Sequence, residues 1–189
     1  AIGGYTLREN TTGTENTAIG HTALAANTTA NYNVAVGWRA LNDNTTGASN
    51  TAVGRNAGGA ITTGEQNTFV GTNAGNSQTT SHYNVAVGQD SLQACTTGQE
   101  NTAVGRHAGY AITTATNNTA VGTAALDACT TGSGNTTVGQ RSGGSITTGH
   151  SNAALGKDSL INCTTGYFNT AVGKDALFTC TAGEDNTGI

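Results

Sequence analysis

The sequence predicts an all-β protein, a β-solenoid (a parallel β-helix or β-roll) in which about eleven 17-residue coils stack on one another. Three observations predict it. Asn recurs at intervals of 17 residues from Asn16 to Asn186 without a slip, a Gly and an aliphatic residue stand at fixed distances after it, and charged residues make up only 10%. Disorder does not require such a register, whereas a solenoid stacks equal positions of successive coils in columns.

The register defines one continuous segment, with a partial coil 1–15, ten full coils 16–185 and a partial coil 186–189. Positions are numbered 1 to 17 from the Asn that begins each repeat. Helical repeats need at least about 33 residues, and collagen needs Gly at every third position together with Pro, which is absent. A contour of roughly 56 Å predicts two or three short strands per coil. The chain begins and ends within a repeat without capping sequences, so we expect an excerpt of a longer fibre.

The first strand of each coil is expected at positions 2 to 4, as in Thr102, Ala103 and Val104. Side chains alternate in direction along a strand. The bulky residue at position 4 is therefore predicted to point into the coil, and the Ala at position 3 to point outward. A column of small outward residues predicts close approach of another chain, and hence an oligomer.

The corners and the core follow from the other fixed positions. Gly at positions 5 and 15, such as Gly105 and Gly98, predicts corners with positive φ. Asn at position 1 predicts a ladder of stacked amides. Leu at position 9 alternates with Ile at position 12, which predicts that both fill the same core space. The repeat with Gly75 and Gln78 breaks this rule.

All four cysteines stand at position 12, and the sequence predicts that each is a small buried hydrophobe: Cys95, Cys129, Cys163 and Cys180. Because Cys163 and Cys180 fall on neighbouring coils, a disulfide between them is sterically conceivable, as are bridges between chains. No C-x-x-C motif occurs, so no metal site is expected.

Charges and aromatic residues gather at the corner positions, which predicts a solvated rim or, alternatively, ligand contacts. The candidate surface contacts are Trp38, Arg39, Tyr110, Tyr167 and Phe168. The four histidines fall on well-separated coils and no Ser/His/Asp grouping occupies adjacent columns, so no catalytic residues, no cofactor and no enzyme activity are expected; an enzyme built on a β-helix stays the weaker alternative. A net charge of −4 argues against a nucleic-acid partner. No run of 18 apolar residues and no signal peptide occur, so membrane insertion is not expected.

The repeat in Asn101–Gly105 and Asn169–Gly183 resembles repeats of phage tail fibres and related surface fibres. The run Asn84–Gly88, Asn-Val-Ala-Val-Gly, is similar to head repeats of trimeric autotransporter adhesins, whose repeat is shorter; the 17-residue unit therefore favours the tail-fibre side. Both resemblances imply a parallel homotrimer outside the cell, on a virion or on a bacterial surface. The shared motif is scaffold, so no ligand-binding residues carry over.

The sequence therefore leads to one function and two alternatives. The first is a structural or adhesive segment of a trimeric extracellular fibre that mediates or spaces attachment to a cell-surface glycan or protein receptor. The second is the head of a bacterial trimeric adhesin. The third is an ice-binding solenoid, based on the Thr columns at positions 13 and 14. Adjacent strand residues point to opposite faces, which weakens the third.

Overall fold

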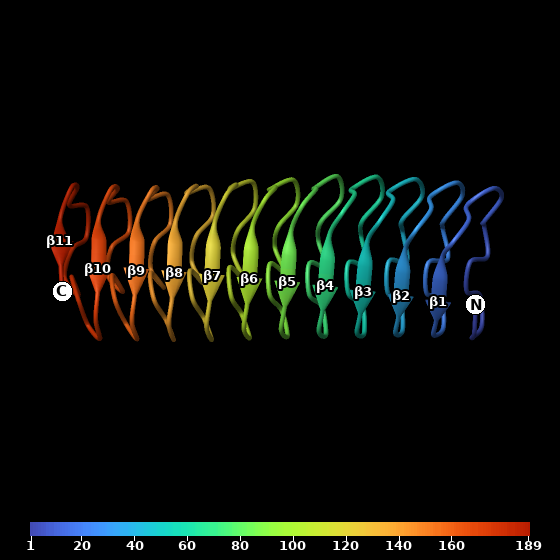
Figure 1. The fold of residues 1–189 in the computed structure, drawn as a ribbon, viewed down its shortest axis with the longest axis horizontal. Coiled ribbons are helices and arrows are strands. Elements are labelled where there is room, and N and C mark those ends of the chain that lie inside the picture. The colour runs from blue at the N-terminus through green and yellow to red at the C-terminus, as the bar shows by residue number, and fades with distance from the viewer.

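The computed structural model describes all 189 residues and contains strands and turns but no helix. Eleven short parallel strands form one sheet in sequence order, and the chain winds as a rod with its termini at opposite ends (Figure 1). The strands are β1 (Thr17–Ile19), β2 (Val34–Val36), β3 (Thr51–Val53), β4 (Thr68–Val70), β5 (Val85–Val87), β6 (Thr102–Val104), β7 (Thr119–Val121), β8 (Thr136–Val138), β9 (Ala153–Leu155), β10 (Thr170–Val172) and β11 (Thr187–Gly188). The predicted parallel β-solenoid is confirmed.

The strands pair in register at the repeat length, so that Ala103 of β6 lies beside Ala86 of β5 and Ala120 of β7. Each coil contains one strand rather than the predicted two or three. The reason lies in the backbone, because positions 5, 7, 9 and 17 of almost every coil have positive φ. In the sixth full coil, for example, φ is 59° at His107 and 58° at Gly109. Left-handed residues at alternate positions fold the chain into consecutive turns and prevent a second strand.

The two Gly columns have different causes. At position 5 the prediction is confirmed: Gly105 has a φ of 134°, and a Cβ there would lie 2.6 Å from the carbonyl oxygen of Gly122. At position 15 the prediction of positive φ is wrong, since Gly98 is not among the positive-φ residues. A Cβ on Gly98 would instead lie 2.4 Å from the carbonyl oxygen of Ala115. Close approach of the next coil, rather than a left-handed corner, favours Gly at position 15.

The predicted direction of the strand side chains is wrong. The position-3 residues point inward, and Ala103 is fully buried, whereas Val104 at position 4 is 36% exposed. The alternation itself holds, but its phase is reversed. The coil interior is narrow and already receives the side chains of positions 8, 9 and 12, so only a small side chain fits at position 3. The Ala column is therefore part of the core and cannot be a surface for another chain.

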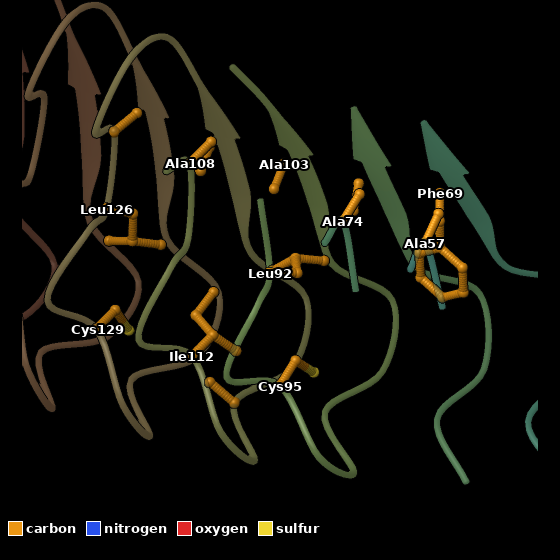
Figure 2. Packing of buried hydrophobic residues seen from close by; sticks show 14 of the residues in the cluster. Ala57, Phe69, Ala74, Leu92, Cys95, Ala103, Ala108, Ile112, Leu126 and Cys129 are labelled. Carbon is orange, nitrogen blue, oxygen red and sulfur yellow. The ribbon is translucent and has the colours of Figure 1, made fainter. Parts of the chain in front are cut away.

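The core is a single cluster of 27 buried residues that runs along the rod. Leu126 at position 9 and Ile112 at position 12 both point into it (Figure 2). A Cβ added to Gly109 would lie 3.1 Å from Cδ1 of Ile112, which confirms that the two positions share one space.

The exceptional repeat of Gly75 and Gln78 has a substitute for the missing bulk. Phe69 replaces Ala at position 3 of the same coil, is fully buried, and occupies the space that Leu fills elsewhere (Figure 2). A Cβ on Gly75 would lie 2.3 Å from Cε1 of Phe69. One large side chain per coil is thus preserved, although it comes from another position.

The predicted amide ladder at position 1 is present and buried. In its centre, Oδ1 of Asn118 accepts hydrogen bonds from the backbone N–H of Asn135 at 2.9 Å and from its Nδ2 at 3.2 Å. Nδ2 of Asn118 donates to Oδ1 of Asn101 and to the carbonyl of Gly132 in its own coil. The side chain therefore joins three coils, and it satisfies backbone groups that no strand pairs.

Position 12 carries a second, shorter row of Asn side chains, and Cys takes the place of Asn in other coils because both can donate a hydrogen bond to the carbonyl of position 15. Nδ2 of Asn44 donates to the carbonyl of Gly47, and Sγ of Cys129 makes the same bond to Gly132. Ile61 cannot continue the amide ladder, and Oδ1 of Asn44 beside it has no partner. Cys95, Cys129 and Cys163 are buried, as predicted, whereas the prediction is wrong for Cys180, which is half-buried in the last full coil. All four thiols are free, so no disulfide joins Cys163 to Cys180. Burial raises the pKa of Cys95 to about 12.

Candidate binding surfaces

The strand face carries a continuous row of outward aliphatic side chains, here called the aliphatic ribbon. It consists of the position-4 residues Ile2, Ile19, Val36, Val53, Val70, Val87, Val104, Val121, Val138, Leu155, Val172 and Ile189. Beside it runs the position-2 row, which is mostly Thr. Between the two terminal rungs, exposure of the ribbon is greatest at Leu155, at 52%. The chain leaves this face uncovered in part, since Ile19, Val53, Val70, Val104 and Val172 are each 36–39% exposed; Figure 1 shows the strands from which these side chains project.

The side chains of the strand face are regularly spaced along the rod. In-register parallel strands place equivalent side chains about 4.8 Å apart along the rod. Two outward columns, one of β-branched hydrocarbon and one mainly of hydroxyl, therefore run parallel to the rod axis on a nearly flat surface. Monomeric soluble proteins rarely expose a long contiguous apolar strip, and such strips mark interaction sites.

The turn after each strand, at positions 6 and 7, carries six of the seven basic residues and three of the eleven acidic ones. Several of these charges are neutralised locally: Nε of Arg141 lies 2.6 Å from Oδ1 of Asp158, whose side chain is only 6% exposed. The hydrogen bond from Arg141 holds the pKa of Asp158 below its ordinary value. Arg39, Arg55 and Arg106 form no ion pair with any carboxylate. The turn edge therefore carries ion pairs toward its C-terminal end and unpaired arginines nearer its N-terminus.

Two of those cations share one aromatic ring. The guanidinium carbon of Arg39 lies 5.4 Å from the ring centroid of Trp38, and that of Arg55 lies 5.5 Å from it. The indole is 45% exposed. It lines two hollows of about 460 Å³ and 470 Å³, one toward the preceding coils and one toward the following coils. Asp43 and Arg39 line both hollows.

The five predicted surface residues fall into three places. Trp38 and Arg39 lie together, as their adjacency requires. Tyr110 lies four coils farther along the same turn edge, with its ring centroid 5.0 Å from that of His107. Tyr167 and Phe168 lie at the position-16 and position-17 corner, where both rings pack on His150. The structure does not bring the three groups into one site.

Arg55 is the residue that the sequence interpretation missed at the Trp38 site. The signal was present in the register, because Arg55 occupies position 6 exactly one repeat after Trp38, and equal positions stack. The residue 17 positions from an aromatic residue is its neighbour in the next coil, so the pairing of Trp38 with Arg55 follows from the repeat length.

No group of three or more His, Cys, Asp or Glu side chains is placed to hold a metal ion. None of the chain forms a helix long and apolar enough to span a membrane. The class of protein that the fold defines is a parallel β-solenoid with 17-residue coils. Comparisons with protein-family models, with curated proteins and with solved structures give no match to this chain.

Proposed function

We propose that this chain is a structural and adhesive segment of a trimeric extracellular fibre of the phage tail-fibre type, which spaces or mediates attachment to a cell surface. The observation that carries the proposal is the aliphatic ribbon, which continues over the full length of the solenoid. The resemblance of the Asn-Thr-Ala-Val-Gly repeat to fibre repeats supports the same reading.

A second copy of the chain is the partner that fits the ribbon best. A partner with the same 17-residue repeat can place an aliphatic side chain opposite Val87, Val104 and every other rung at once. The rungs are partly to largely exposed, so covering the whole row contributes on the order of 10 kcal/mol per chain. Cyclic symmetry around a common axis covers all ribbons equally, and three chains close such an arrangement.

The head of a bacterial trimeric adhesin is the alternative within the same architecture. The ribbon and the solenoid serve it equally, and the shorter repeat of those heads favours the tail-fibre reading. Both place the protein outside the cell.

An ice-binding surface is a second candidate function, favoured by one specific observation. The strand face presents outward Thr102 at position 2 and outward Val104 at position 4, repeated on a flat sheet. The Thr columns at positions 13 and 14 are less suitable, because the position-13 hydroxyls donate to the next coil, as from Thr96 to the carbonyl of Thr113 at 3.2 Å. This candidate needs the strand face free, whereas a trimer covers it.

The mass of the protein in solution tests the proposal. Light scattering on the purified chain is expected to give three times the chain mass. The double variant Val87→Lys/Val104→Lys, in the middle of the ribbon, is expected to give monomers because it places two charges in an apolar contact. The matched control Thr72→Lys/Gln89→Lys adds the same charges at the exposed position 6 and is expected to remain trimeric. A wild-type monomer refutes the trimer, and thermal hysteresis of that monomer would establish the ice-binding alternative.

A further inference from the structure

We propose that Trp38, Arg39 and Arg55 form a binding site for an acidic saccharide, a sugar that carries a carboxylate. The proposal deepens the fibre function, on which it rests for its biological meaning, by naming the chemistry of a receptor. The site itself is argued from the side chains of the turn edge alone.

The first argument is an uncompensated charge. Two guanidinium groups lie within 5.5 Å of one indole centroid, and neither has a carboxylate within ion-pair distance. Cation–π contact stabilises each Arg on the ring, but no carboxylate balances either charge. Three of the five ion pairs in the chain join sequence neighbours, and Arg141 reaches an Asp one coil away. Arg39 and Arg55 are therefore two cations that contact an aromatic ring but no carboxylate of the chain. The carboxylate of a bound ligand would accept bidentate hydrogen bonds from a guanidinium group.

The second argument is the polar lining of the two hollows beside the indole. Asn42 and Asp43 line the hollow toward the N-terminus, and Asn56 and Asn76 line the other. Nδ2 of Asn56 donates to Oδ1 of Asn76 at 2.8 Å, so these amides are already ordered. Amide and carboxylate groups offer both donors and acceptors. This mixture suits the hydroxyl groups of a sugar, whereas an apolar ligand would leave the polar groups unpaired.

The third argument is the exposed indole. A single Trp with 45% exposure between two hollows gives a flat apolar platform of the size of a pyranose ring. Asp43 is the one carboxylate that lines the hollows; it accepts a hydrogen bond from Asn42 and forms no ion pair with Arg39 or Arg55. It is therefore available as an acceptor for a sugar hydroxyl. A simple inorganic anion would use only the cations, and a neutral sugar would use only the platform.

Arg106 provides a comparison within the chain. It occupies position 6, as Arg55 does, and it also lacks an ion pair, but no aromatic ring of a neighbouring coil contacts it. An unpaired Arg at this edge is therefore not by itself the site. The site requires the combination of unpaired arginines with Trp38 and the two hollows. This combination occurs once in the chain and does not follow from the repeat.

Intrinsic fluorescence tests the site directly, because Trp38 is the only Trp in the chain. The purified wild-type protein is titrated with trigalacturonic acid, with maltotriose as a neutral trisaccharide, and with citrate as a carboxylate without a sugar. We expect a saturable change in Trp38 emission with trigalacturonic acid, at least tenfold weaker binding of the other two, and weakening by added salt.

Variants assign the contacts. Arg39→Gln and Arg55→Gln keep the fluorophore and are each expected to weaken trigalacturonic acid binding at least tenfold, whereas Arg106→Gln is expected to leave it unchanged. Equal binding of maltotriose or citrate, an equal loss in Arg106→Gln, or no saturable signal overturns the proposal. Light scattering on the same samples is a separate readout, since the site lies on the turn edge and the fibre proposal depends on the strand face. A trimer without binding refutes the site alone, and binding by a monomer refutes the trimer alone.

Discussion

Phe69 offers the sharpest test of how the coil interior is filled. Its ring lies where Gly75 leaves room, since a Cβ on Gly75 would come within 2.3 Å of Cε1 and 2.4 Å of Cδ1. Other coils place Ala at position 3 and Leu at position 9, as Ala86 and Leu92 do. The double variant Phe69→Ala/Gly75→Leu restores that arrangement. Each single variant should therefore be strongly destabilising, and the double variant should recover most of the loss.

The magnitudes follow from burial and backbone. Phe69 is fully buried, so Phe69→Ala is expected to cost about 3–5 kcal/mol. Gly75→Leu alone is expected to cost about 3 kcal/mol, the upper end for overpacking, because the new side chain would occupy the volume of the ring. In the double variant only the left-handed conformation of a Leu remains, at roughly 1–2 kcal/mol. Leu92 already accepts a φ of 47° at this position, and Gly75 has 58°.

Urea unfolding followed by circular dichroism, at one fixed chain concentration, measures these differences as shifts of the transition midpoint. The control combines Phe69→Ala with Gly143→Leu, four coils away, where the two losses should add. Additive losses in Phe69→Ala/Gly75→Leu as well would show that the two side chains do not share one space, and the account of the core would fail.

Three further predictions use the same assay. Asn118→Ala leaves the backbone N–H of Asn135 without its acceptor, and we expect a loss of about 1–3 kcal/mol; a wild-type midpoint would contradict the ladder. Burial raises the pKa of Cys95 from 9.0 to about 12, so the folded state holds this proton more tightly. Stability should then fall as the pH rises above about 9, and less so in Cys95→Ala. The pKa of Asp158 is lowered from 3.8 by Arg141, so their contribution is present at neutral pH and lost as the pH falls below about 4. Midpoints at pH 3 and pH 6 should differ less in Arg141→Gln.

The sequence was sufficient for the periodic part of the fold. An unbroken 17-residue register fixes which residues stack, so the coil length, the parallel sheet, the buried Asn ladder and the shared space of positions 9 and 12 were all predictable. The number of strands was not. Positive φ at residues such as Arg39 and Leu41 belongs to turns whose type depends on contacts with both neighbouring coils, and ordinary side chains at these positions give no signal.

The predicted phase of the strand is wrong for a physical reason. The prediction takes the bulkier side chain as the buried one, which places Val104 inside and Ala103 outside. That rule assumes an interior large enough for the bulkiest side chain, but a Cβ on Gly109 would lie only 3.7 Å from Cβ of Ala103. In so narrow a coil the small residue is the one that fits inside. The Trp38 site was half predicted, because Trp38 and Arg39 are adjacent, whereas Arg55 reaches the ring only through stacking.

The reversed phase sharpens the argument about function. Val104 and its equivalents point outward and stack on one another along the sheet, and the part of each side chain that stays exposed forms an aliphatic strip that repeats in every coil. The proposed second copy of the solenoid repeats with the same period and can cover this strip along its whole length, whereas a globular receptor cannot. The combination of Trp38 with Arg55 does not repeat, which fits the proposed ligand that binds at one place. The strand face and the turn edge can therefore serve assembly and recognition at the same time, because covering the ribbon leaves the indole and its two arginines free.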